Sequence, residues 1–486
     1  MRWRSGTRAV ASSGAALLVS LAGGCSFGII DVSPCEANAD CRDAFGLGSA
    51  CAADGYCELV DIPARCLRTY PEDLFDDPES YQDAVVLGSV YDETAFPLEV
   101  QSIDLAVFHA NDGGGLDGEP FAVIHCTNHE DGALDDLSQD EANEASAVFL
   151  TETLDVPTLI GPATSARTEA AFLAVSDTLV ISPSATSVAL TALDETAPSD
   201  DAPGLLWRTA PPDSLQGEVI AGDMLGRLED IGGAPSGWSV AVIYRPDSYG
   251  EGLTEEFERH WSGAGGAASR FSFSSSSELS ESVTDVGSGA YHEVLFISSE
   301  KEDITAFLNA AAVLNGYQDK AIFLTDGAYD TDILDDAEAA SALFEQIRGT
   351  VPTPPAGTVY EAFLASFSAF YQGQNASDSG FTAQAYDATW LALYGAAWSV
   401  EEEGGLSGPG SARGLRRISD GAVVELRSGS WEPWAYSFAD GAGIDVVGAS
   451  GALDYDPDTE ETSGPVAVWA VAPTGQGFEV LYTVEP

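Results

Sequence analysis

Basic residues are scarce in this chain. Its 486 residues include 19 Lys and Arg against 78 Asp and Glu, which gives a formal net charge of −59. Lysine occurs only at Lys301 and Lys320, so most acids have no basic partner and must be solvated. Such a surface repels phosphate groups, which argues strongly against nucleic-acid binding. The acidic excess is either an adaptation to saline surroundings, where ions screen the self-repulsion, or a neutral drift in composition. We favour salt adaptation.

Sequence motifs of catalysis, cofactor binding and metal binding are also missing. The five histidines are scattered, and there is no nucleophile elbow, phosphate loop or dinucleotide fingerprint. Asp454, Asp456 and Asp458 are spaced as in a calcium loop. However, Pro457 lies between them, and Thr459 replaces the glycine that such a loop needs. We therefore expect no enzyme, no cofactor and no metal site.

No segment beyond the N-terminus is long and apolar enough to span a bilayer. Three arginines within the first eight residues precede an apolar stretch at residues 15–21, as in a secretory signal. The small residues Ala22-Gly23-Gly24 before Cys25 resemble a bacterial lipobox. The resemblance implies that residues 1–24 are a lipoprotein signal peptide and that Cys25 becomes the acylated N-terminus; ordinary cleavage nearby is the alternative. The protein is then exported and held by its lipid alone, on the periplasmic or cell-surface side of a bacterial membrane.

Cysteine is confined to the first 126 residues. Six cysteines follow Cys25, and an even number in an exported protein indicates disulfides. Four of them are separated by five, nine and five residues, a spacing that does not fit the C-x2-C pairs of a zinc site. We expect two bridges within residues 35–57 and a third between Cys66 and Cys126, so that residues 25–80 form a tether and a cysteine-rich module. The six are Cys35, Cys41, Cys51, Cys57, Cys66 and Cys126.

From residue 84 onward, short apolar strands alternate with amphipathic helices. This alternation predicts an α/β fold with mostly parallel sheets and helical crossovers. The series restarts near Leu206 and breaks again at the prolines of residues 352–355. We expect two lobes joined by three crossings, near Thr209, Pro352 and Ile444. Lobe 1 would comprise residues 81–205 plus 353–440, and lobe 2 residues 206–352 plus 441–486.

Two neighbouring strands of lobe 1 end in small, hydroxylated residues. Residues 159–160 lead into Gly161-Pro162-Ala163-Thr164-Ser165, and residues 179–181 lead into Ser182-Pro183-Ser184-Ala185-Thr186. The carboxyl edge of a parallel sheet is where ligands bind, and hydroxyls with free N–H groups suit a carboxylate. The alternative is that Ser165 and Thr186 only cap helices.

Five segments in order resemble one known family. Besides the two hydroxylated loops, they are Trp207-Arg208-Thr209-Ala210-Pro211-Pro212-Asp213, Asp247-Ser248-Tyr249-Gly250-Glu251-Gly252 and Ala385-Tyr386-Asp387-Ala388. Together they resemble the branched-chain amino acid binding family, which has the type 1 periplasmic-binding fold. The resemblance runs from about Ala84 to the C-terminus. It implies two α/β lobes, each a mostly parallel sheet flanked by helices, and three hinge crossings.

The resemblance also implies a binding site and a role. The ligand's carboxylate would lie at the loops of Thr164, Ser165, Ser184 and Thr186. Tyr249 would cover the ligand from lobe 2, and Asp326 would receive its ammonium. The alternatives are a surface aromatic for Tyr249 and one more solvated acid for Asp326. The implied function is a solute-binding protein of an ABC-type importer, which binds an amino acid or similar small zwitterion or carboxylate and delivers it to an ABC permease. A ligand-sensing or surface scaffold lipoprotein that keeps the fold without transport is the alternative.

Overall fold

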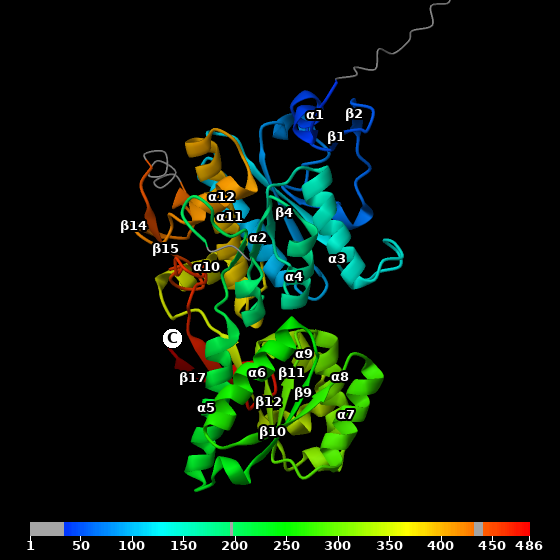
Figure 1. Ribbon diagram of the computed structural model, residues 1–486, viewed down its shortest axis with the longest axis vertical. Helices are drawn as coiled ribbons and strands as arrows, with labels where there is room; N and C mark the ends of the chain where they lie inside the picture. Colours follow the sequence, from blue (N-terminus) through cyan, green and yellow to red (C-terminus); the bar gives the residue numbers. More distant parts are fainter. Residues whose placement is uncertain (1–33, 195–197, 432–440) are drawn as a thin grey trace, which may run out of the picture.

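The computed structural model describes residues 34–194, 198–431 and 441–486 (Figure 1). The expected signal peptide and Cys25 lie outside these residues. The chain forms a small N-terminal module and two lobes, which lie one above the other in Figure 1. Within the described part of the chain, none of the helices has the length and apolar character needed to cross a bilayer.

The N-terminal module is short and bound by disulfides. It contains α1 (Asn38–Phe45) and a hairpin of β1 (Ser49–Cys51) and β2 (Cys57–Leu59). Cys35 is bonded to Cys51 and Cys41 to Cys57, while Cys66 is bonded to Cys126 in lobe 1. The two bridges expected within residues 35–57 and the one expected between Cys66 and Cys126 are therefore present, and the structure adds the pairing within the module. The module contacts lobe 1 through Arg42, whose guanidinium donates to the Ala84 carbonyl at 2.7 Å.

Lobe 1 is built on a six-stranded sheet of order β3-β5-β4-β6-β7-β8. All neighbouring pairs are parallel except β3 with β5. Helices α2, α3 and α4 alternate with the strands, and α10, α11 and α12 join the lobe after the chain returns from lobe 2. The bounds are β3 (Arg68–Tyr70), β4 (Val85–Tyr91), α2 (Pro97–Asp112), β5 (Phe121–Thr127), α3 (Gln139–Val148), β6 (Thr158–Ile160), α4 (Ser165–Ala174), β7 (Leu179–Ser182), β8 (Leu206–Arg208), α10 (Thr358–Phe370), α11 (Thr382–Glu403) and α12 (Gly408–Leu415).

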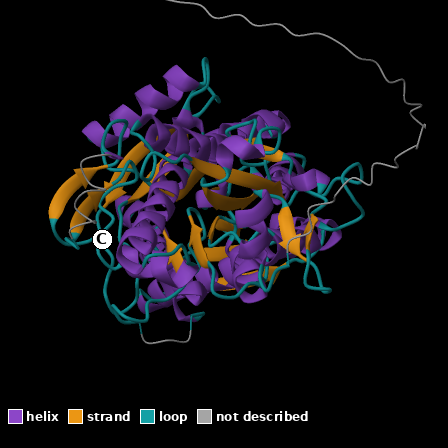
Figure 2. Ribbon diagram, turned by 90° about the horizontal axis from the view of Figure 1, so that it is seen from above, coloured by secondary structure: helices purple, strands orange, loops and turns teal. Residues whose placement is uncertain are grey.

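Lobe 2 is built on a seven-stranded sheet of order β10-β9-β11-β12-β13-β16-β17. The strands from β10 to β13 are parallel, and at one edge β16 pairs antiparallel with both β13 and β17. Figure 2, seen from above, shows helices around the strands. The bounds are α5 (Asp213–Asp230), β9 (Ser239–Tyr244), α6 (Ser248–Gly263), β10 (Ala267–Ser272), α7 (Ser276–Ser288), β11 (Glu293–Ile297), α8 (Lys301–Ala312), β12 (Ala321–Leu324), α9 (Thr331–Asp336), β13 (Ile347–Pro352), β16 (Val466–Val471) and β17 (Phe478–Val484).

Two of the expected crossings are in place and the third is not. The chain passes between lobes after β8 and after β13, near Thr209 and Pro352. Ile444 instead begins β15 (Ile444–Val447), which pairs with β14 (Ala422–Glu425) and packs into the core of lobe 1. The third crossing lies near Pro465, whose carbonyl accepts from the Thr353 N–H at 3.0 Å. By pairing and packing, β8 and β15 therefore lie with lobe 1, whereas we expected them to belong to lobe 2. After the third crossing, β16 and β17 lie in lobe 2, as expected.

The long helix α11 is the centre of the lobe 1 core. The sequence predicts one apolar face along Tyr386, Trp390, Leu393 and Ala397. In the structure almost every side of the helix is buried. This follows from its position, since α2, α12 and the strands β6 and β7 all contact it. A helix that is covered on all sides shows a weak amphipathic pattern.

Candidate functional site

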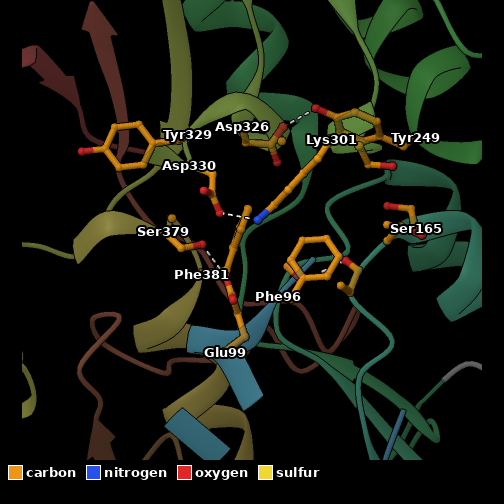
Figure 3. A pocket seen from close by; sticks show the side chains of 16 residues that line it. Phe96, Glu99, Ser165, Tyr249, Lys301, Asp326, Tyr329, Asp330, Ser379 and Phe381 are labelled. Carbon is orange, nitrogen blue, oxygen red and sulfur yellow. Dashed lines mark hydrogen bonds and ion pairs between the residues drawn. The ribbon is translucent and has the colours of Figure 1, made fainter. Parts of the chain in front are cut away.

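A cavity lies between the two lobes, at the carboxyl ends of their parallel strands (Figure 3). It encloses about 470 Å³ of space, including its opening to solvent. Lobe 1 contributes Phe96, Glu99, Ala163, Thr164, Ser165, Ser184, Ser379, Gly380 and Phe381. Lobe 2 contributes Tyr249, Ser299, Lys301, Asp326, Gly327, Tyr329 and Asp330.

The lobe 1 wall begins at a turn that only glycine fits. After β6, Gly161 has φ +92°, and a Cβ there would lie 2.6 Å from the Val90 carbonyl oxygen. Glycine alone tolerates that conformation and that contact. The turn brings Ser165 to the first position of α4, against the cavity. A helix N-terminus has unpaired N–H groups and a positive dipole end, both of which favour an anion.

The two serines of this wall differ in what their hydroxyls already do. The Ser184 hydroxyl donates to the Ala163 carbonyl at 2.8 Å. Ser165 Oγ instead accepts from the Ser187 N–H at 3.2 Å, so its own hydrogen can be donated to a ligand. Ser165 is therefore the better placed of the two to bind a carboxylate.

Thr186 does not line the cavity, although its loop does. It is 1 % exposed, and its hydroxyl donates across the lobe boundary to Asp326 Oδ2 at 3.4 Å. Its hydroxyl thus faces the acid of lobe 2. The other five residues that the sequence singled out, Thr164, Ser165, Ser184, Tyr249 and Asp326, all line the cavity.

Asp326 is the acid at the centre of the lobe 2 wall. It follows β12 and is 5 % exposed. Its Oδ1 accepts from the Tyr249 hydroxyl and, at 3.0 Å, from Gln216 Nε2. Burial raises the pKa of Asp326, and the hydrogen bonds from Tyr249 and Gln216 lower it less than burial raises it. A cationic ligand group would stabilise its charged form.

Lys301 and Asp330 form a second charged group on the lobe 2 wall, which sequence reasoning missed. Lys301 Nζ is 2.5 Å from Asp330 Oδ2 and also donates to the Ala95 carbonyl of lobe 1. The ammonium lies 5.2 Å from the centre of the Phe96 ring, a favourable cation–π distance. The signal available in the sequence was scarcity, because Lys301 is one of only two lysines in the chain.

Glu99 is the acid of the lobe 1 wall, and sequence reasoning missed it as well. It lies in the first turn of α2 and is 2 % exposed. Its Oε1 accepts from the Ser379 hydroxyl, while Oε2 has no hydrogen-bond partner among the described residues. Burial raises the pKa of Glu99, and the nearby charge of Lys301 opposes part of that shift. Figure 3 shows Glu99 and Asp326 on opposite sides of the cavity.

The lobes are closed over the cavity by direct contacts. Arg167 of α4 lies 3.0 Å from Glu300, which precedes α8. The Ser187 hydroxyl donates to the Ser248 carbonyl at 2.5 Å, and Lys301 reaches the backbone of lobe 1 as described above. These contacts shield the cavity from water and strengthen any charged interaction within it.

Metal ligands are not gathered in this cavity. Within the described residues, the one cluster with metal-binding spacing is Cys35, Cys41 and Cys51, and all three are in disulfides. In the loop that resembles a calcium site, Asp456 Oδ1 accepts from the backbone N–H groups of Asp458 and Thr459. It thus closes a turn.

Both the sequence and the fold of this chain are similar to those of known proteins. Residues 87–421 match the profile of a family described as periplasmic binding protein. No curated protein matches the sequence. Among solved structures, the chain resembles the branched-chain amino acid substrate-binding protein LivJ from Streptococcus pneumoniae in complex with isoleucine, with 20% identity and a TM-score of 0.60. The match covers 83% of this chain and 100% of that one.

Two other solved structures match over a similar extent. The leucine binding protein LivK from Thermotoga maritima shares 17% identity with a TM-score of 0.61, and the match covers 83% of this chain and 99% of that one. A solute binding protein from R. palustris in complex with 4-hydroxybenzoate shares 14% identity with a TM-score of 0.60, and the match covers 83% and 97%. At sequence identities this low, the similarity shows a shared fold.

Proposed function

The chain belongs to the periplasmic binding protein family, and we propose that it captures an amino acid or a similar small zwitterion between its lobes. The observation that carries this proposal is the opposition of the two cavity walls. Lobe 1 offers the Ser165 hydroxyl and the N-terminus of α4, which suit a carboxylate. Lobe 2 offers the buried carboxylate of Asp326, which suits an ammonium. A zwitterion satisfies both walls at once.

The expected affinity follows from the number of charged contacts. Hydrogen bonds to charged groups contribute about 1.5–3 kcal/mol each. Three or four of them would support a dissociation constant of about 1 μM, which corresponds to roughly 8 kcal/mol. The inter-lobe contacts of Arg167 and Lys301 form only when the lobes meet, so they would favour the closed, ligand-bound state.

We further propose that the protein is a lipid-anchored component of an ABC-type importer and delivers its ligand to a permease. The lipobox before Cys25 supports the anchor. The fold shared with LivJ, the substrate binding protein of a branched-chain amino acid transporter, supports the transport role. Mass spectrometry of the exported protein should find Cys25 as an acylated N-terminal residue. An unmodified N-terminus at another position would contradict the anchor.

A thermal-shift screen tests the binding proposal. Ligands that bind only the folded protein raise its stability by mass action, by about 2.7 kcal/mol at a concentration of 100 Kd. We expect at least one amino acid in a panel of amino acids and small carboxylates to raise Tm, and Asp326→Asn to reduce that rise. A panel in which no amino acid raises Tm would contradict the proposed ligand class. A response limited to carboxylates without an amine would favour a plain carboxylate binder.

A further inference from the structure

The cavity is lined by more carboxyl groups than the single ammonium of a simple zwitterion can pair with. Its titratable lining residues are Glu99, Asp326, Asp330, Lys301 and two tyrosines. Lys301 is engaged with Asp330 at 2.5 Å, and these two charges offset each other. Glu99 and Asp326 then remain, one on each lobe. An amino acid with an uncharged side chain brings one ammonium, which can pair with one of these two carboxyl groups and leaves the other without a cationic partner.

Glu99 is built as a binding group and is not a solvated surface acid. Its side chain is 2 % exposed and faces the cavity, as Figure 3 shows. Ser379 holds one carboxylate oxygen, and the other oxygen, Oε2, has no partner among the described residues. A buried acceptor without a donor is destabilising, and more so when it is charged. A ligand donor that reached Oε2 would remove this cost.

Lys301 does not fill that role. Its ammonium donates to Asp330 on its own lobe and to the Ala95 carbonyl across the cleft. No hydrogen bond or ion pair between Lys301 and Glu99 is present in the described part of the chain, and the two interact only through their charges. The nearby rings of Phe96 and Phe381 line the cavity between charged groups and could cover an alkyl chain.

We propose that the ligand carries a second cationic group, which binds Glu99, so that the preferred substrates are basic amino acids of the lysine and ornithine type. This inference rests on the proposed function and assigns the ligand's groups to separate residues. The α-ammonium binds Asp326, the carboxylate binds Ser165, and the side-chain ammonium binds Oε2 of Glu99. Glu99 is then the residue that selects a basic side chain over an aliphatic one.

The test compares two ligands that differ at one end. Norleucine has the same carbon chain as lysine without the side-chain ammonium. Titration calorimetry on the wild type should give at least tenfold tighter binding of lysine than of norleucine. In Glu99→Gln the ratio should fall to near one, because the amide keeps a bond to Ser379 but loses the charge. The matched control is Glu361→Gln, an exposed acid of lobe 1, which should keep the wild-type ratio.

The outcomes separate this inference from the proposed function. Norleucine or another neutral amino acid binding as tightly as lysine to the wild type would overturn the basic-ligand inference and leave the amino acid proposal standing. A lysine preference that survives in Glu99→Gln would overturn the role of Glu99. Failure of every amino acid to bind would overturn both. The wild-type ratio does not depend on any variant folding.

Discussion

The two lobes contribute to the cavity in different ways. In lobe 1, the Cys66–Cys126 disulfide links the segment that follows the N-terminal module to strand β5. The lobe 1 wall of the cavity consists largely of hydroxyls, backbone groups and the single acid Glu99. Lobe 2 contains no cysteine in its sequence, and its wall carries the charges of Asp326, Asp330 and Lys301. Hydroxyl and backbone groups thus predominate on the lobe 1 wall, and charged groups on the lobe 2 wall. The comparison indicates that ligand orientation is determined by which lobe holds which end.

Removing the Cys66–Cys126 disulfide should make lobe 1 less stable and leave the stability of lobe 2 unchanged. Cys66 and Cys126 are 60 residues apart, and a bridge of that length stabilises by about 4 kcal/mol in the chain-entropy model. In the double variant Cys66→Ala/Cys126→Ala, the free energy of unfolding of lobe 1 should fall by about 4 kcal/mol. In calorimetry the unfolding transition of lobe 1 should therefore move to a lower temperature, while that of lobe 2 stays unchanged. An equal fall in both transitions would show that the lobes unfold as one unit.

The stability of lobe 1 should depend on pH through Asp387. Burial raises the pKa of Asp387 from 3.8 to about 7, although Ala449 and Ser450 donate to its carboxylate. The folded lobe therefore binds this proton more tightly than the unfolded chain does. The resulting stabilisation is present at low pH and is lost as the pH rises through 7.

The variant Asp387→Asn measures this contribution. Between pH 5 and pH 8, the free energy of unfolding of the wild type should fall by about 3 kcal/mol relative to that of the variant. Chemical denaturation at several pH values provides the measurement. A difference that stays constant, or grows with pH, would mean that the carboxylate is already charged at pH 5.

The lobe 1 wall is probed by a pair of serines. Ser165→Ala removes a hydroxyl whose hydrogen is available to the ligand, and should weaken binding by about 1–3 kcal/mol. Ser184→Ala is the control, because its hydroxyl already donates to the Ala163 carbonyl. It should weaken binding less. Equal effects of the two in calorimetry would indicate that the ligand's carboxylate does not lie at Ser165.

The smallest effect is expected from the contact that closes the lobes. Glu300→Gln breaks the ion pair with Arg167. The side chain of Glu300 is 17 % exposed and that of Arg167 is 11 % exposed. Partly exposed pairs contribute about 1 kcal/mol or less, so affinity should fall no more than about fivefold, through faster dissociation. Stopped-flow kinetics would show this. Glu251→Gln, which breaks a pair with Arg270 inside lobe 2, should leave the dissociation rate unchanged.

Much of the architecture could be predicted from the sequence, because it depends on local patterns. The apolar runs at residues 159–160 and 179–181 lie in β6 and β7, and the alternation of strands and helices from residue 84 onward is present in both lobes. The third crossing could not be placed, since the apolar residues of β15 signal a strand but not its partner. Its position near Pro465 depends on packing between segments far apart in the sequence.

Some residues of the candidate site could likewise be predicted from the sequence, and others could not. Ser165 and Asp326 follow predicted strands, where a sheet edge brings ligand groups together. Glu99 and Lys301 lie in the first turns of helices and have no motif around them. They line one cavity only because the two lobes close. Glu99 became recognisable as a binding group from its burial and its unpartnered oxygen, which no sequence pattern records.

The most direct test of the account is the effect of Asp326→Asn on two forms of one ligand. Asn keeps an oxygen for the hydrogen bonds from Tyr249 and Gln216, both of which reach Oδ1. It removes the charge and the acceptor of the long 3.4 Å hydrogen bond from Thr186. Calorimetry should compare the amino acid found in the screen with its analogue that lacks the α-amine. The account predicts at least tenfold weaker binding of the amino acid and unchanged or tighter binding of the analogue. Equal weakening of both would contradict an ammonium at Asp326.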